Sequence, residues 1–158
     1  MEKREARDSL FQTPASQRLV DLIERNAAEL TNQYLHDVKQ QAGMPTYRSF
    51  DEKEVYSRAF RVYSQLGKWL SQETTRDQIK KYWMSLGHDR RAEGFALSEI
   101  IQSLCLIRRH LWLKVESEGL IDTALELYQA IDLYNRVMVF FDRALYYAAL
   151  GYEEKDRE

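Results

Sequence analysis

Histidine is the side chain that most often carries proton transfer, metal binding or haem ligation near neutral pH, and this sequence contains His36, His88 and His110. No two of them are three or four positions apart, so one helix face cannot present a pair to a metal ion, and no HExxH motif is present. A single imidazole can still hold a haem iron. Tetrapyrrole binding is therefore kept as an alternative, while ordinary surface or half-buried histidines are the interpretation we favour.

Arginines are the second group with recognisable chemistry, because guanidinium groups bind carboxylates and phosphates through paired hydrogen bonds. Two pairs, Arg90–Arg91 and Arg108–Arg109, lie on either side of a predicted helix break at Gly94–Phe95. If the pairs converge across the break, they form a pocket for an anion. Pairing with nearby acidic side chains is the simpler interpretation, and the sequence supplies Asp89, Glu93 and Glu99.

Aromatic residues make up 12% of the sequence, enough to line an apolar pocket between helices as well as to fill a core. Core packing is their commoner role. Taking aromatic, histidine and arginine side chains together, we predict a ligand pocket with seven candidate residues: Tyr82, Trp83, His88, Arg91, Phe95, Arg108 and Trp112.

Signatures of enzymatic chemistry are missing from the sequence. It contains no GxSxG motif, no cysteine–histidine signature of a nucleophilic enzyme and no glycine-rich loop that would hold a phosphate. The single cysteine, Cys105, lies between two leucines, which favours a buried and inert thiol. We therefore predict no catalytic residue, no metal site, no cofactor and no enzymatic activity, with an enzyme of unrecognised site kept as a further alternative.

Composition and charge restrict the class of protein. The chain of 158 residues is 44% hydrophobic and 30% charged, which is typical of a folded globular protein and not of a disordered one. Its net charge of -2 creates no overall field that would attract nucleic acid or an anionic membrane. The apolar runs are too short to span a membrane, and the charged N-terminus does not resemble a signal peptide. A cytoplasmic location is expected, which a single cysteine also fits.

Helical periodicity dominates the sequence, and no stretch alternates with the period of two that strands require. We predict an all-α, single-domain bundle of five to six helices, spanning residues 16–152, with a flexible or weakly helical segment 1–15 and a charged tail 153–158. The main helices are expected at about 16–42, 49–71, 76–92 and 97–118, and a long final helix follows Thr123 and runs to about 152. Capping boxes are predicted at Ser49–Glu52, at Thr75–Gln78 and at Asp122-Thr123 followed by Glu126, and Gly94 is expected in a left-handed or otherwise unusual backbone conformation.

The final helix carries more apolar residues than one core contact needs. One stripe contains Leu127, Ile131, Tyr134 and Met138, and a second contains Leu133, Val137, Phe140, Ala144 and Tyr147. The polar strip between them is interrupted at three candidate interface positions: Val139, Tyr146 and Leu150. Such a helix is either central in its domain or in contact with another subunit. We predict a homodimer through this helix, or through the first helix beside it.

Three blocks of the sequence, 45–70, 86–112 and 120–147, resemble the N-terminal domain of RsbR/RsbRD-type stressosome co-antagonists. The most specific part is the Arg-x-x-Glu-Gly-Phe run at 90–95, followed by Leu-Ser-Glu at 97–99, the arginine pair at 108–109 and Trp112. The resemblance implies an all-helical, non-haem globin-like domain that dimerises and serves as a signal-input module. Domains of this kind are usually fused to an output domain of the STAS or kinase type.

The chain departs from that pattern in two respects. No STAS domain follows within its 158 residues, so the phosphorylated threonines of that domain cannot be carried over, and Ala96 stands where a proline is expected. We therefore expect a stand-alone regulatory or sensory domain that acts through protein–protein interaction, with a signalling partner supplying the output. It is further expected to accept a small ligand, to bind no nucleic acid and to insert into no membrane.

The alternative with bound haem is directly testable. Because the sequence lacks a dedicated set of haem ligands, we expect the purified protein to be colourless and not to bind added haemin stoichiometrically. Absorption spectroscopy measures this. A Soret band that disappears in His88→Ala or His110→Ala would show that the haem alternative is correct.

Overall fold

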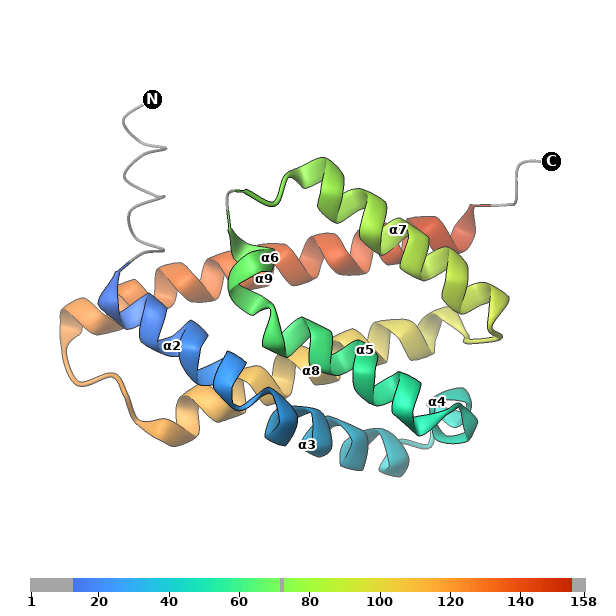
Figure 1. Cartoon of the computed structure of the whole chain (residues 1–158), viewed down its shortest axis with the longest axis horizontal. Helices are drawn as coiled ribbons and strands as arrows, with labels where there is room; N and C mark the ends of the chain where they lie inside the picture. Colours follow the sequence, from blue (N-terminus) through green and yellow to red (C-terminus); the bar gives the residue numbers. More distant parts are fainter. Residues whose placement is uncertain (1–12, 72, 155–158) are drawn as a thin grey trace.

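The computed structural model describes residues 13–71 and 73–154, and within these ranges the chain forms eight helices and no strand (Figure 1). The helices are α2 (Pro14–Arg25), α3 (Ala27–Gln40), α4 (Pro45–Ser49), α5 (Glu52–Ser64), α6 (Leu66–Leu70), α7 (Arg76–Ala92), α8 (Leu97–Glu118) and α9 (Ala124–Glu153). The predicted all-α class is confirmed. A search of the described part finds no helix long and apolar enough to cross a membrane.

The three longest helices form one side of the bundle. α8 follows α7 after the turn at Gly94, and α9 returns from the end of α8 to lie beside α7 (Figure 1). The shorter helices α2, α3 and α5 pack across this group, with α5 in front of α8 in the view of Figure 1. A core of buried apolar side chains lies between the two groups.

The contact between α7 and α9 is made by backbone against backbone. Gly87 of α7 lies against the carbonyl of Ala148, and Gly151 of α9 lies against the carbonyl of Met84, so that a Cβ atom at either glycine would overlap with these oxygens. Only glycine permits this approach, because any other side chain would hold the helices apart. The two glycines therefore set the distance between the longest helix and α7.

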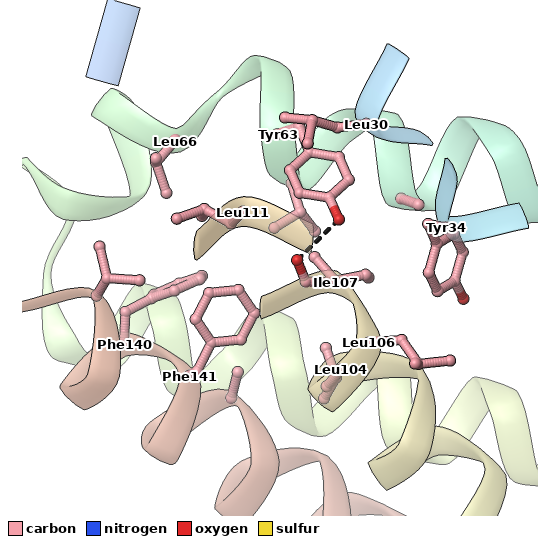
Figure 2. Packing of buried hydrophobic residues seen from close by; sticks show 14 of the residues in the cluster. Leu30, Tyr34, Tyr63, Leu66, Leu104, Leu106, Ile107, Leu111, Phe140 and Phe141 are labelled. Atoms are coloured by element: carbon pink, nitrogen blue, oxygen red, sulfur yellow. Dashed lines mark hydrogen bonds between the residues drawn. The ribbon is translucent and has the colours of Figure 1, made fainter. Parts of the chain in front are cut away.

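The core itself combines large apolar side chains from nearly every helix. Figure 2 shows Phe140 and Phe141 of α9 facing Ile107 and Leu111 of α8, with Tyr63 of α5 above them. The hydroxyl of Tyr63 donates a hydrogen bond of 2.8 Å to the carbonyl oxygen of Ile107. Burial of each large apolar side chain contributes about 1.5–3 kcal/mol. The bond allows a tyrosine to occupy this apolar position without leaving a buried hydroxyl unpaired.

Helix boundaries governed by local signals agree with the prediction. α7 and α8 have the predicted bounds, and the capping box of Thr75 and Gln78 is present. Thr123 caps α9, as its hydroxyl accepts from the N–H of Glu126. Gly94 has the expected positive φ, at 94°.

The number of helices was underestimated, because the predicted helix at 16–42 is two helices separated at Asn26. The amide Nδ2 of this residue donates to the carbonyl of Leu22 at 2.7 Å. Asparagine side chains compete with the backbone for helical acceptors in this way, which ends a helix where apolar periodicity continues. α2 also begins earlier than predicted, at Pro14, with Thr13 as its cap. The segment 1–15 was expected to be flexible or weakly helical. Residues 1–12 of this segment lie outside the described part of the chain.

The predicted helix at 49–71 was wrong at its start and in its middle. Asp51 caps α5, whereas Ser49, the predicted cap, is the last residue of the short helix α4, which was not predicted. The helix also breaks at Gln65, where the N–H of Gly67 donates to the carboxylate of Glu24 at 2.8 Å. This carboxylate comes from α2, so the break depends on a contact between helices.

The predicted tail begins at Glu153, the last residue of α9, and residues 155–158 are outside the described part.

The glycine contact between α7 and α9 gives a stability prediction. In Gly151→Ala, the added methyl group forces the backbones apart, at a cost that we expect to lower the free energy of unfolding by about 2 kcal/mol. This change opposes the gain of ~1 kcal/mol that alanine normally brings to a helix interior. Urea denaturation measures the difference.

Gly43→Ala is the matched control, because nothing lies within 4 Å of a Cβ atom at Gly43 and its φ is not positive. We expect its stability to be unchanged or slightly raised. Equal stabilities for the two variants would show that the helices do not meet at Gly151.

Candidate functional site

A surface cleft of about 550 Å³ separates α5 from α7, and its volume is in the range of small-molecule sites. Its lining contains more basic than acidic side chains: Arg58, Arg61, Lys81 and Arg90 against Glu54 and Asp89. Tyr82 and Leu86 add apolar surface. In a chain of net charge -2, this cleft is therefore a local basic region with an apolar wall.

One carboxylate, that of Glu93, holds together two arginines of the cleft. Its Oε2 accepts from Nη2 of Arg58 at 2.8 Å, and its Oε1 accepts from Nη1 of Arg90 at 2.8 Å. The guanidinium of Arg58 also lies 5.0 Å from the centre of the Phe50 ring, within the range of a cation–π contact. Glu93 is the residue that ends α7, so this pairing joins the end of one helix to the middle of α5.

A second, inner cavity of about 40 Å³ lies behind the cleft, and Arg58, Tyr82, Leu86 and Arg90 line both spaces. Trp83 lines the inner cavity and is only 1% exposed. Its indole Nε1 and the Nη1 atom of Arg58 are buried and have no hydrogen-bond partner among the described residues. Both atoms are donors on side chains that line the inner cavity, and an acceptor entering that cavity could satisfy them.

Hydroxyl-bearing side chains also line the inner cavity. The Tyr34 hydroxyl of α3 and the Ser103 hydroxyl of α8 are 2.6 Å apart. Burial raises the pKa of Tyr34, and the nearby Tyr47 raises it further. Burial likewise raises the pKa of Tyr47. Both phenols are therefore neutral near pH 7 and serve as hydrogen-bonding groups rather than as bases.

Of the seven predicted pocket residues, Tyr82 and Trp83 line the cavities. Phe95 is buried next to them, with its ring 4.5 Å from that of Tyr47. Arg91 is exposed at the other side of α7 and donates to the carbonyl oxygen of Tyr152 at 2.8 Å. These four residues therefore do not form one pocket: Tyr82, Trp83 and Phe95 lie at or beside the inner cavity, whereas Arg91 lies outside it.

The other three predicted residues lie elsewhere. His88 is exposed on α7, with Nδ1 3.6 Å from a carboxylate oxygen of Asp89. Arg108 is half-buried on α8, eleven residues after its start, which corresponds to about 16 Å along the helix. Trp112 lies one turn further on and packs against Tyr134, with ring centres 4.7 Å apart. Distance along α8 therefore separates them from the basic cleft.

The remaining histidines have partners outside the cleft. Nε2 of His110 is 2.6 Å from a carboxylate oxygen of Asp37, which joins α8 to α3. His36 is exposed, and its Nε2 is 3.0 Å from the amide of Gln40. Within the described residues, no group of three or more His, Cys, Asp or Glu side chains is placed to hold a metal ion.

Sequence reasoning missed Arg58, although a signal was present. It stands among Val55, Ala59 and Val62, which are three of the four buried positions of α5. A basic residue within an apolar stripe indicates a charge that must find a partner inside the bundle. That partner, Glu93, is 35 residues away in sequence, and no local pattern connects the two.

A second feature is an apolar surface on α9 and its approach from α8. Nine of the eleven exposed large apolar side chains of the described part belong to it: Leu113, Ile121, Leu125, Leu127, Tyr128, Ile131, Tyr134, Val139 and Tyr146. We call this set the α9 face. It includes two of the three predicted interface positions, whereas Leu150 is half-buried. The other apolar stripe of α9, which contains Val137 and Phe140, is buried as a core contact.

In comparisons with protein-family models, curated proteins and solved structures, nothing matched the chain significantly. The resemblance to stressosome co-antagonists therefore stays a prediction from the sequence.

The buried tyrosines make stability sensitive to alkaline pH. A tyrosine with a raised pKa in the folded state contributes stability that is present below its ordinary pKa of about 10 and is lost as the pH rises toward the folded pKa. Burial raises the pKa of Tyr34 and of Tyr63. We expect Tyr34→Phe to reduce the loss of unfolding free energy above pH 10 by up to ~1.4 kcal/mol per pH unit.

Urea denaturation at a series of pH values measures this slope. At neutral pH the variant should lose only about 1 kcal/mol, because it leaves Ser103 without its tyrosine partner. Tyr128→Phe, which removes an exposed hydroxyl, is the control. If Tyr34→Phe and the wild type have the same alkaline slope, the phenol does not titrate with unfolding.

Proposed function

We propose that this protein is a regulatory signal-input domain of the cytoplasm that acts by self-association and by contact with a signalling partner that supplies the output. The observation that carries the proposal is the α9 face. Monomeric soluble proteins rarely expose so many large apolar side chains together, and such surfaces usually mark interaction sites. The absence of a recognisable catalytic motif in the sequence favours the same class of function.

The size of the α9 face suits a stable dimer. The exposure of its nine side chains ranges from 37% to 73%. Since a large apolar or aromatic side chain has roughly 150–250 Å² of surface, the face amounts to on the order of 900 Å². A standard protein interface buries about 800 Å² on each partner.

A second copy of this chain is the occupant we propose for this face. Between positions 130 and 144 the charged residues of α9 are Asp132, Arg136, Asp142 and Arg143, two of each sign, whereas Glu126 and Glu153 near the two ends are acidic. Along this middle stretch, an identical surface brought against it by a two-fold axis meets no net repulsion. The helix has 30 residues, about 45 Å in length, which provides a long contact for a parallel or antiparallel partner helix.

We further propose that the domain is of the non-haem globin-like type found in stressosome co-antagonists. The sequence blocks at 45–70, 86–112 and 120–147 support this assignment, together with the all-helical fold. The inner cavity of about 40 Å³ is far smaller than the space a tetrapyrrole needs, and neither His88 nor His110 lines it. His36 and His110 line a surface hollow of about 600 Å³, but its other lining residues are Glu29, Asn32, Gln33 and Asp37, which offer no apolar wall for a tetrapyrrole. These observations favour the non-haem type over the haem-binding alternative.

A negative charge on the α9 face should weaken the dimer. We expect Tyr146→Glu and Val139→Glu each to raise the dissociation constant at least tenfold, because the interface would have to bury an unpaired carboxylate. Sedimentation velocity over a range of concentrations measures the constant, and circular dichroism should show unchanged helicity.

Phe60→Glu is the control, as Phe60 is an exposed aromatic residue of α5 outside the α9 face. The control should dimerise like the wild type. A monomeric wild type at high concentration would contradict the proposal, and so would a control variant that loses the dimer equally.

A further inference from the structure

We propose that the cleft between α5 and α7 binds a small organic acid, whose carboxylate replaces that of Glu93 between Arg58 and Arg90. The apolar body of the acid would lie against Tyr82 and Leu86. This inference rests on the proposed sensory function and gives it a class of ligand.

Two side chains that line the inner cavity carry buried donors in need of an acceptor. Nη1 of Arg58 and Nε1 of Trp83 are buried without a partner among the described residues. Trp83 is only 1% exposed, so its N–H is well removed from bulk solvent. A buried donor without a partner costs about 1–3 kcal/mol. A ligand that satisfies these atoms must offer oxygen lone pairs, as a carboxylate does.

Glu93 already shows which group the two arginines accept. Each of its oxygens takes one hydrogen bond of 2.8 Å from a different guanidinium. Neither arginine is bound in the bidentate manner that its planar donors favour, so an incoming carboxylate can improve on this geometry. The side chain of Glu93 is 24% exposed at the end of α7, where it can move away into solvent. It therefore acts as an internal competitor for the acid.

The cleft also supplies the remainder of the site. Its four basic side chains outnumber Glu54, Asp89 and the adjoining Glu93 by one, which raises the local concentration of anions. Its volume of about 550 Å³ accommodates a molecule with a body beyond the carboxylate, whereas the inner cavity of about 40 Å³ admits little more than one small group. The body must then lie outside, next to the ring of Tyr82. These dimensions favour an acid with a flat apolar or aromatic body over a bare inorganic anion.

Isothermal titration calorimetry of the full chain with three probes tests the ligand class. We expect 3-phenylpropionate to bind, and the uncharged 3-phenylpropionamide to bind at least tenfold more weakly, because it cannot pair with both guanidinium groups. Inorganic phosphate should bind more weakly than the acid, since it makes no contact with the apolar wall. Equal affinities for acid and amide would overturn the proposal, and tighter binding of phosphate would overturn the organic-acid class.

Variants test the role of each residue. Glu93→Gln keeps the size of the side chain but removes the competing charge, so we expect the affinity for 3-phenylpropionate to rise about tenfold, with no change for the amide. Arg58→Gln should lower the affinity for the acid at least tenfold. Arg109→Gln removes an equal charge from an exposed position of α8 outside the cleft and should change nothing.

The outcomes separate this inference from the proposed function. If Glu93→Gln fails to bind the acid, or if Arg58→Gln and Arg109→Gln bind it equally, the site is wrong even where sedimentation shows the dimer. If the acid binds as expected but the protein is monomeric, the site stands and the proposed self-association fails. Circular dichroism of each variant verifies that the fold is retained.

Discussion

The close contact between α7 and α9 is the constraint on which the rest of the structure depends. Gly87 and Gly151 let the two backbones meet, and the rings of Trp83 and Phe140 then pack beside the crossing, 5.9 Å apart. α7 is held at one distance from the longest helix, so its opposite side faces α5 at the cleft. The arginine of α7 that lines this cleft, Arg90, is positioned by the same crossing. The two glycines therefore determine the shape of the core and also that of the candidate site.

Bonds between distant residues hold the α7–α8 turn in place. The hydroxyl of Tyr152 donates to the carbonyl oxygen of Phe95 at 2.8 Å, which ties the end of α9 to the turn. Glu99 is a buried carboxylate of α8 that accepts from the N–H groups of Thr46 and Ala96. It caps α4 and α8 together, and its charge is stabilised by these donors and by the starts of two helices. Glu93 stands at the start of the turn that these bonds hold, and its carboxylate lies between Arg58 and Arg90.

α9 has apolar side chains on two sides, one buried and one exposed. One side supplies Val137, Phe140 and Phe141 to the core, and the other side carries the α9 face, which includes Tyr128 and Tyr146. Because a helix at the edge of a bundle can bury only one side in its own chain, the second apolar side is available to another molecule. The cleft lies on the far side of α7 from this helix, so a ligand and a second subunit would not compete for the same atoms. The contact between α7 and α9 connects the two regions mechanically.

Local chemistry was sufficient to predict the all-helical class, the bounds of α7 and α8, and the positive φ of Gly94. Capping residues, glycines and a period near 3.6 act within one or two turns, and they can be recognised in the sequence. The breaks at Asn26 and Gln65 and the short helix α4 escaped prediction. At Gln65 and in α4, the stabilising groups come from Glu24 and Glu99 on other helices. The same applies to the candidate site, where Tyr82 and Trp83 were predicted as pocket residues from their type and line the inner cavity. The pairing of Arg58 with Glu93 was decided only by the tertiary structure, since a charge within an apolar stripe specifies that a partner is needed but not where in the chain it lies.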